Sequence, residues 1–284
     1  MSQDRQRVSV RRMPGRAEQQ DYLVVEEPLE LVLRYSHRND DSNDYSGELV
    51  EKTIAITMRT PGNDTVLAAG FFFTEGVIES AADIVAIDAA ENRVVVSLRA
   101  ELIPDLKLLE RHFYTSSSCG VCGKTSLEAL RAVAPYSLPQ SGFAIAEAAL
   151  CQLPAALLSG QGAFSATGSA HAAALFDDNG NLTAVYEDVG RHNALDKLIG
   201  NALLSGELPL HDKGVLLSGR AGFELVQKTR MAASPLLVAI GAPSSLAVDL
   251  AWESGMTLAG FLRSTGFNVY ACPDRIAKPA AGLL

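Results

Sequence analysis

The chain has 284 residues, of which 48% are hydrophobic and 20% charged, so it can bury the cores of one large or two ordinary domains. Its formal net charge of −9 excludes a general nucleic-acid or membrane-surface binder, although a local basic pocket for one phosphorylated ligand is compatible with this charge. No apolar run reaches the roughly eighteen residues of a membrane span. Four cysteines are too few for a secreted disulfide scaffold, which favours a cytoplasmic protein with free thiols.

The first twenty residues differ from the rest of the chain. They contain five arginines against Asp4 and Glu18, and they lack the apolar stretch that a signal peptide requires. Met-Pro-Gly follows the pair Arg11-Arg12, where a twin-arginine export signal would need a hydrophobic region. We therefore expect residues 1–20 to be a disordered, basic tail.

The part from residue 21 to 140 is expected to be a β-rich domain with a cysteine-containing loop at its end. Short runs rich in apolar and β-branched residues predict strands at 22–25, 29–35, 53–59 and 94–98. One helix is predicted at 67–78, and the segment 37–47 consists of turn-forming polar residues.

The part from residue 141 to 284 alternates between helices and strands. The predicted order is αββαβαβαβ, with segments at 144–159, 171–176, 182–187, 191–204, 213–219, 222–231, 235–241, 245–256 and 267–272. Helices between single apolar strands require crossover connections, which predicts a mixed, mostly parallel sheet with helices on both faces. The fold class is therefore α/β, or α+β over the whole chain, and ligands in such sheets bind beyond the carboxyl ends of the strands.

The segment YTSSSCGVCGKTSL at 114–127 holds two cysteines three residues apart, Cys119 and Cys122, followed by Lys124. A zinc site is disfavoured, because it would need four ligands and no second cysteine or histidine pair completes it. When a Cys-X-X-Cys pair lies at a helix start, the pKa of its first thiol is lowered, and Lys124 adds a positive charge nearby.

Serines precede this cysteine pair, whereas a thioredoxin-like unit would place a buried strand there, so we predict an exposed loop. This placement suits a thiol that carries sulfur as a persulfide between a donor and an acceptor. Two alternatives stay open, namely a disulfide-exchanging pair and a chance pair in a serine-rich turn.

The segment EDVGRHNALDK at 187–197 joins a predicted strand to a predicted helix. Arg191 and His192 enter the helix N-terminus, where free N–H groups bind anions and a guanidinium can bind phosphate in a bidentate manner. The structural alternative is a simple helix cap at this junction. We expect Asp196 and Lys197 to lie on the solvated face of the helix.

The segment SGRAGFELVQK at 218–228 repeats this arrangement of strand, arginine-bearing turn and helix. Ser218, Gly219 and Arg220 form the predicted turn. Two arginine-bearing helix starts on adjacent strands are predicted to flank one phosphorylated ligand.

A further polar segment, ATGSAHAAAL at 166–175, leads into a predicted strand. It contributes Thr167, Gly168 and His171 to the candidate binding residues. For the histidine, a structural role at the strand start is the alternative.

Together these motifs resemble the formate dehydrogenase accessory sulfurtransferase family, FdhD. The resemblance rests on the segments SSSCGVCGK, TPGND, LAAGFFFTEG, ATGSAHAAALF, EDVGRHNALDK, SGRAGFELVQK, APSSLAVDLA, GMTLAGFLR and FNVY. They run in the same order over residues 20 to 275.

The resemblance implies a cytoplasmic, dimeric sulfur carrier with a fold similar to that of cytidine deaminases. Such a protein accepts persulfide sulfur from a cysteine desulfurase and passes it to a molybdenum (or tungsten) bis(molybdopterin guanine dinucleotide) cofactor. That cofactor is then inserted into formate dehydrogenase, and GDP or another guanine nucleotide binds as its surrogate. Deaminase activity is disfavoured, because the helix starts read RHNA and SGRAGF where a zinc deaminase has H-x-E and P-C-x-x-C.

The resemblance also assigns roles to residues. Cys119 would carry the persulfide, Cys122 would relay the sulfur or displace it by forming a disulfide, and Lys124 would stabilise the thiolates. The arginine-bearing turns would hold the cofactor, and no metal site is expected. Part of the cofactor contact is assigned to Phe267, Asn268, Val269, Tyr270, Ala271 and Cys272.

Three positions depart from the family pattern. Ser169 stands where a second glycine is usual, Gly222 stands where serine is usual, and Tyr270-Ala271-Cys272 replaces an ending similar to Tyr-Thr-His. Losing a hydroxyl and an imidazole is expected to alter the nucleotide contacts. Two other functions stay open: a cofactor-binding chaperone without reactive cysteines, and a CxxC thiol-disulfide oxidoreductase.

Overall fold

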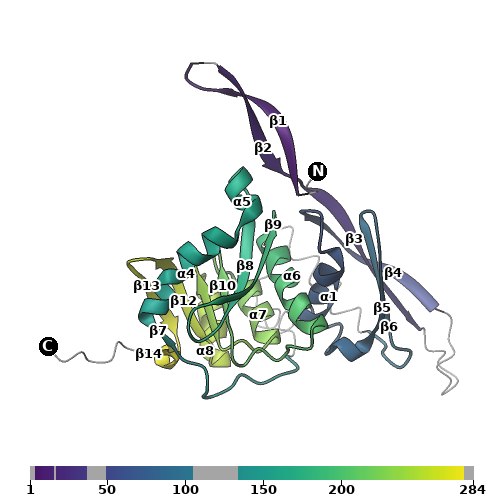
Figure 1. The fold of residues 1–284 in the computed structure, drawn as a ribbon. Coiled ribbons are helices and arrows are strands. Elements are labelled where there is room, and N and C mark those ends of the chain that lie inside the picture. The colour runs from purple at the N-terminus through teal and green to yellow at the C-terminus, as the bar shows by residue number, and fades with distance from the viewer. Residues whose placement is uncertain (1–3, 16, 37–48, 105–133, 278–284) are drawn as a thin grey trace.

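The computed structural model describes residues 4–15, 17–36, 49–104 and 134–277. Within these residues the chain forms two main β-sheets, with helices between them and on the far face of the larger sheet (Figure 1). The mixed α/β class predicted from the sequence is confirmed. Every helix in this part of the chain is too short or too polar to cross a membrane.

The smaller sheet comes from the N-terminal half and has the strand order β4-β3-β6-β5. Its strands are β3 (Glu27–Ser36), β4 (Leu49–Arg59), β5 (Ile84–Ala90) and β6 (Arg93–Leu98). Leu29, Leu31 and Leu33 of β3 all enter the core, as the period of two along a strand requires. The sequence prediction missed β5, whose residues are exposed or half-buried.

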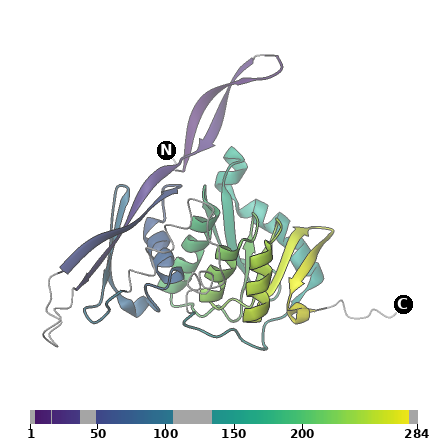
Figure 2. The ribbon, with the colours of Figure 1, turned by 180° about the vertical axis from the view of Figure 1, so that it is seen from behind.

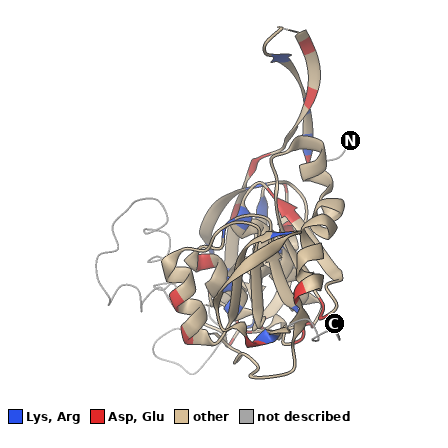
Figure 3. Cartoon of the chain, turned by 90° about the vertical axis from the view of Figure 1, so that its left-hand side faces the viewer, with Lys and Arg blue, Asp and Glu red and all other residues tan. Residues whose placement is uncertain are grey.

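A two-stranded hairpin precedes this sheet and projects from the body of the protein (Figures 1 and 2). Its strands are β1 (Arg5–Arg12) and β2 (Ala17–Val24). The prediction that residues 1–20 are a disordered tail is therefore wrong for the described residues of β1 and β2. Half-buried Val8 and Val10 alternate with exposed residues in β1, which is the pattern of a strand, and residues 13–15 form the turn. Charged residues of both signs lie along the hairpin (Figure 3).

The larger sheet comes from the C-terminal half and has the order β13-β12-β11-β10-β8-β9. Its strands are β8 (His171–Phe176), β9 (Leu182–Asp188), β10 (Gly214–Leu217), β11 (Leu236–Ala239), β12 (Thr257–Arg263) and β13 (Gly266–Ala271). β11 pairs in parallel with β10 and with β12, whereas the other three pairs are antiparallel. The sheet is mixed as predicted, but parallel pairs are the minority, because β8 with β9 and β12 with β13 form hairpins and β10 pairs antiparallel with β8.

Strand β12 was missed by the sequence prediction, which extended a helix to residue 256. Helix α8 (Ser245–Ser254) instead ends at Gly255, whose φ of 70° favours glycine. Gly260 weakens the strand pattern of β12, but a side chain there would meet Pro243 at 2.9 Å. The extra strand reverses the chain, so that β13 becomes an antiparallel edge strand.

The remaining helices include α1, which packs against α6, and helices on the two faces of the larger sheet. They are α1 (Asp64–Thr74), α4 (Glu147–Gly160), α5 (Gly162–Thr167), α6 (Arg191–Leu204) and α7 (Phe223–Met231), with short 3₁₀ turns at Ala81–Asp83 and Pro273–Arg275. Helices α6, α7 and α8 lie on one face, while α4 lies on the other (Figures 1 and 2). Two short strands, β7 (Ile145–Ala146) and β14 (Ile276–Ala277), pair beside α4.

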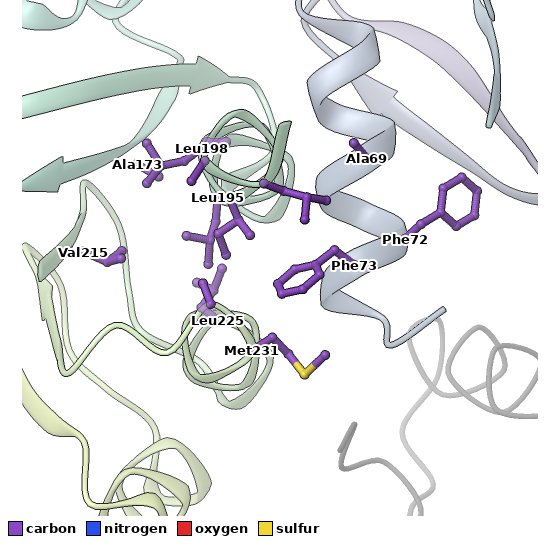
Figure 4. Packing of buried hydrophobic residues seen from close by; sticks show 14 of the residues in the cluster. Ala69, Phe72, Phe73, Ala173, Leu195, Leu198, Val215, Leu225 and Met231 are labelled. Atoms are coloured by element: carbon purple, nitrogen blue, oxygen red, sulfur yellow. The ribbon is translucent and has the colours of Figure 1, made fainter. Parts of the chain in front are cut away.

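Helix α1 belongs to the N-terminal half but packs into the same core as the larger sheet. Figure 4 shows Phe73 pointing toward α7, near Leu225 and Met231, while Phe72 points to the opposite side of α1. Both rings are fully buried, and one hydrophobic cluster contains residues of β3, α1, α6, α7 and β10. The predicted domain division at residue 140 stays a prediction, and this core extends across it.

Helices α1 and α6 cross at two glycines, Gly70 and Gly200. A Cβ on Gly70 would overlap the carbonyl oxygen of Asp196, and one on Gly200 would overlap the carbonyl oxygen of Val66. Neither glycine has a positive φ, so both positions require the absence of a side chain and not an unusual backbone conformation. The two helix backbones therefore lie in direct contact.

Replacing Gly200 tests this crossing. Gly200→Ala should lower the free energy of unfolding by about 3 kcal/mol, because the new methyl group meets backbone atoms that cannot rotate away. Gly162→Ala is the matched control, since nothing lies within 4 Å of a Cβ there, and its effect should stay within about 1 kcal/mol. Urea unfolding followed by circular dichroism measures both, and equal effects of the two substitutions would contradict the close crossing.

Candidate functional site

One edge of the larger sheet brings several polar segments together. β9 ends here at Asp188, β10 at Leu217 and β11 at Ala239, while antiparallel β8 begins here at His171. Helix α6 starts directly after β9, and α7 starts after β10. Ligands of open α/β sheets bind at such an edge, where loops meet helix N-termini.

The N-terminus of α6 carries Arg191 and His192. Its N-cap residue is Gly190, which provides no side-chain cap, whereas the hydroxyl of Ser244 caps α8. His192 Nε2 lies 2.8 Å from a carboxylate oxygen of Glu224 in α7, and this hydrogen bond lowers the pKa of the Glu224 carboxyl below its ordinary value. The first turn of α6 thus offers a guanidinium and backbone N–H groups to an anion.

Ser218, Gly219 and Arg220 form the turn between β10 and α7. The Ser218 hydroxyl oxygen accepts a hydrogen bond of 2.8 Å from the backbone nitrogen of Ala172, which ties this turn to β8. Arg220 is exposed, and the N-cap residue of α7, Gly222, again provides no side-chain cap. The structure therefore places two arginine-bearing, glycine-capped helix starts at one edge. The prediction that they follow adjacent strands is wrong, because β8 lies between β9 and β10.

His171 lies between these two turns. A Cβ on Gly219 would be 3.3 Å from His171 Nδ1. Burial lowers the pKa of His171, and the positive charge of Arg191, joined by that of His192 whenever this imidazole is protonated, lowers it further. The imidazole is consequently neutral at pH 7, so it can both donate and accept a hydrogen bond.

A cleft of about 430 Å³ opens at the same edge, between α4, α5 and the sheet. Apolar side chains of α4 and α5 line part of it, together with Gly168, Ser169, His171 and Ser218. Gly168 has a φ of 69° and ends α5. Thr167 belongs to the last turn of α5, where its hydroxyl donates a hydrogen bond of 2.8 Å to a carbonyl oxygen of the same helix.

The predicted contact segment on β13 is only partly brought to this edge. Asn268 pairs with Gly260 on the side of the arginine-bearing turns, whereas Cys272 lies at the opposite edge, where its carbonyl oxygen accepts a hydrogen bond from Thr257. Burial raises the pKa of the Cys272 thiol, which makes it a poorer nucleophile at neutral pH. The structure therefore does not place Cys272 with the two arginines.

The predicted sulfur-carrying residues Cys119, Cys122 and Lys124 lie outside the described residues, as does the predicted polar loop at 37–47. Their placement on an exposed loop stays a prediction. Cys151, in α4, is half-buried and free.

A buried ion pair fixes the start of α6. Lys197 Nζ lies 2.7 Å from a carboxylate oxygen of Asp188, and neither side chain is more than 1% exposed. Asp188 also accepts hydrogen bonds from the backbone nitrogens of Gly190 and Thr60, at 2.8 and 3.1 Å, and from the Asn193 amide at 3.1 Å. The prediction that Lys197 lies on a solvated face is therefore wrong.

Asp196 was also expected in solvent and is likewise buried. Its carboxylate lies 3.0 Å from Lys228 Nζ, which also contacts Glu75 of the N-terminal half at 2.8 Å. Burial alone would lower the pKa of Lys228, but the charges of Asp196 and Glu75 outweigh it and raise this pKa above its ordinary value. Sequence reasoning missed both pairs because α6 is covered by the sheet on one side and by α1 on the other.

These features define the class of the protein. It is a mixed α/β protein in which one sheet edge presents two arginine-bearing helix starts beside a mostly apolar cleft. A model of the FdhD/NarQ family matches residues 44–277. The chain therefore belongs to the FdhD/NarQ family.

Individual comparisons agree over most of the chain. The Sulfur carrier protein FdhD of Streptomyces avermitilis is 47% identical, covering 92% of this chain and 91% of that protein. The protein of the same name from Sulfolobus acidocaldarius is 40% identical, covering 92% and 93%. A solved structure, described as a formate dehydrogenase accessory protein from Desulfotalea psychrophila, matches with a TM-score of 0.69 and 25% identity, covering 96% of this chain and 98% of that one.

Replacing Lys197 tests whether its buried ion pair with Asp188 holds the start of α6 in place. Lys197→Met should lower the free energy of unfolding by about 3–5 kcal/mol, because Asp188 would remain as an unpaired buried charge. Lys213→Met is the matched control, since the ion pair of Lys213 within the described part of the chain is a long one of 3.9 Å with exposed Asp212, and we expect a loss below about 1 kcal/mol. Urea unfolding at pH 7 gives both values, and a small loss for Lys197→Met would contradict the proposed anchoring.

Proposed function

We propose that this protein is a sulfur carrier that serves formate dehydrogenase. It accepts persulfide sulfur on the segment of Cys119 and Cys122 and transfers it to the molybdenum bis(molybdopterin guanine dinucleotide) cofactor. The observation that carries the proposal is the pair of arginine-bearing helix starts at one sheet edge, in a chain of the FdhD/NarQ family. Related proteins that are named sulfur carriers support the same function.

The sheet edge suits the guanine nucleotide ends of this cofactor, which is the cargo of the protein. The uncapped N–H groups of α6 and α7 attract phosphate oxygens, and Arg191 and Arg220 add guanidinium groups that bind phosphate in a fork geometry. A formal net charge of −9 means that this attraction depends on such local groups. A simple guanine nucleotide such as GDP would occupy the same edge as a surrogate.

The sulfur chemistry needs two thiols. The Cys119 thiolate attacks the outer sulfur of a cysteine persulfide on the donor, and the donor cysteine leaves as a thiolate. Cys122 then takes the outer sulfur in a relay, or attacks the Cys119 sulfur so that hydrosulfide leaves toward the cofactor and a disulfide remains. A dithiol reductant must reduce that disulfide before the next cycle, and Lys124 would stabilise the thiolates in either route.

The partners follow from this chemistry. The donor is a cysteine desulfurase, which forms a persulfide on its own cysteine, and the acceptor of the sulfurated cofactor is the catalytic subunit of formate dehydrogenase. We further propose a homodimer that works in the cytoplasm, where thiols stay reduced.

Intact-mass spectrometry after incubation with a cysteine desulfurase and cysteine tests the carrier chemistry. The wild type should gain roughly 32 Da, the mass of one sulfur atom, and Cys119→Ala should not. Cys151→Ala is the control, because this thiol belongs to α4, and it should gain the same mass as the wild type. No gain in any variant, with nucleotide binding intact, would favour a cofactor-binding chaperone without reactive cysteines.

A further inference from the structure

One residue that lines the cleft beside the arginine-bearing edge, Gln161, carries a buried polar atom without a partner among the described residues. The side chain of Gln161 is only 5% exposed, and its Nε2 atom makes no hydrogen bond in the part of the chain that the structure describes. A buried amide without a partner destabilises a folded protein, so such groups are rare and call for an explanation. An incoming ligand that accepts a hydrogen bond would provide it.

The position of Gln161 is fixed by its surroundings. It lies at the junction where α4 ends and α5 begins. The backbone nitrogens of Ala163 and Phe164, two and three residues further on, donate hydrogen bonds of 2.9 and 2.8 Å to the two carboxylate oxygens of Glu187 in β9. Because this junction is tied to the sheet, the amide is held in place before any ligand arrives.

The cleft has the composition of a site for a small planar ligand. Its volume of about 430 Å³ lies within the range of small-molecule pockets, which are mostly apolar with a few oriented polar groups. Leu157, Phe164 and Ile240 supply apolar walls, while Gln161 supplies an amide. A nucleobase needs both, because its faces are apolar and its edge carries donors and acceptors.

The cleft is continuous with the arginine-bearing edge. Ser218 lines the cleft and is also the first residue of the turn that carries Arg220. His171 lines it as well and lies next to Gly219 of that turn. One nucleotide can therefore have its phosphates at the helix starts and its base in the cleft.

We infer that the cleft holds the nucleobase of the bound nucleotide and that Gln161 selects a 6-oxopurine by donating a hydrogen bond from Nε2 to the 6-oxo oxygen. A 6-aminopurine presents a donor at this position, so two donors would face each other. The inference rests on the proposed function for the identity of the ligand and adds the residue that sets its base specificity.

Calorimetric titration with GDP and ADP, on the full-length protein, tests this inference. The wild type should prefer GDP, and Gln161→Met should weaken GDP binding by about 10- to 100-fold with little change for ADP. Gln161→Glu replaces the donor with an acceptor and should shift the preference toward ADP. Gln227→Met is the matched control, because Gln227 is the other buried amide with an unpartnered atom among the described residues and does not line the cleft. It should bind both nucleotides as the wild type does.

Thermal unfolding separates binding from folding. Gln161→Met should unfold at or above the wild-type temperature, because it removes an unpartnered buried amide. A markedly lower unfolding temperature would indicate a structural role and overturn the inference, as would a GDP-to-ADP preference that Gln161→Met leaves unchanged. A wild type that takes up sulfur on Cys119 but does not distinguish the nucleotides overturns the inference alone. A wild type that neither takes up sulfur nor binds a nucleotide overturns the proposed function as well.

Discussion

The direct contact between α1 and α6 at Gly70 and Gly200 is the constraint on which the rest of the structure depends. Because the two backbones touch, the charged groups beside the crossing are sealed from water, and each must find its partner there. Lys228 does so with Asp196 and with Glu75 of the N-terminal half. Breaking such a buried pair costs far more free energy than breaking a surface pair. The close helix crossing and the buried ion pairs of Lys228 therefore hold the two halves of the chain together at the same place.

Two successive carboxylates of strand β9 connect this part of the core to the candidate site. Side chains alternate between the faces of a strand, so Glu187 and Asp188 point to opposite sides of the sheet. Glu187 holds the start of α5 on one face, and Asp188 holds the start of α6 on the other, where it also binds Thr60 at the end of β4. The apolar cleft and the α6 turn are thus positioned by neighbouring residues, as a site for one ligand with an apolar and an anionic end requires.

Local patterns were sufficient to predict the mixed α/β class and most of the alternation of elements after residue 141, although β12 was missed. They failed where a remote part of the chain decides the outcome. Lys197 and Asp196 read as surface residues, although apolar residues at Leu198, Ile199, Ala202 and Leu203 are spread over more than one side of the helix. Gln161 was not noticed at all, because a glutamine without a partner is visible only once the surrounding packing is known. Residues 1–20 were predicted to be a tail, although β1 and the first part of β2 lie there, because these strands contain few apolar residues.

The central claim is that sulfur taken up on Cys119 reaches a cofactor held at the arginine-bearing edge. Its most direct test is a single-turnover assay in which sulfur-loaded protein, cofactor and inactive formate dehydrogenase are combined and formate oxidation is measured. We predict that Arg191→Ala/Arg220→Ala loads sulfur normally but activates the enzyme at least about tenfold less than the wild type or the surface control Arg93→Ala. Full activation by the double variant would contradict the account.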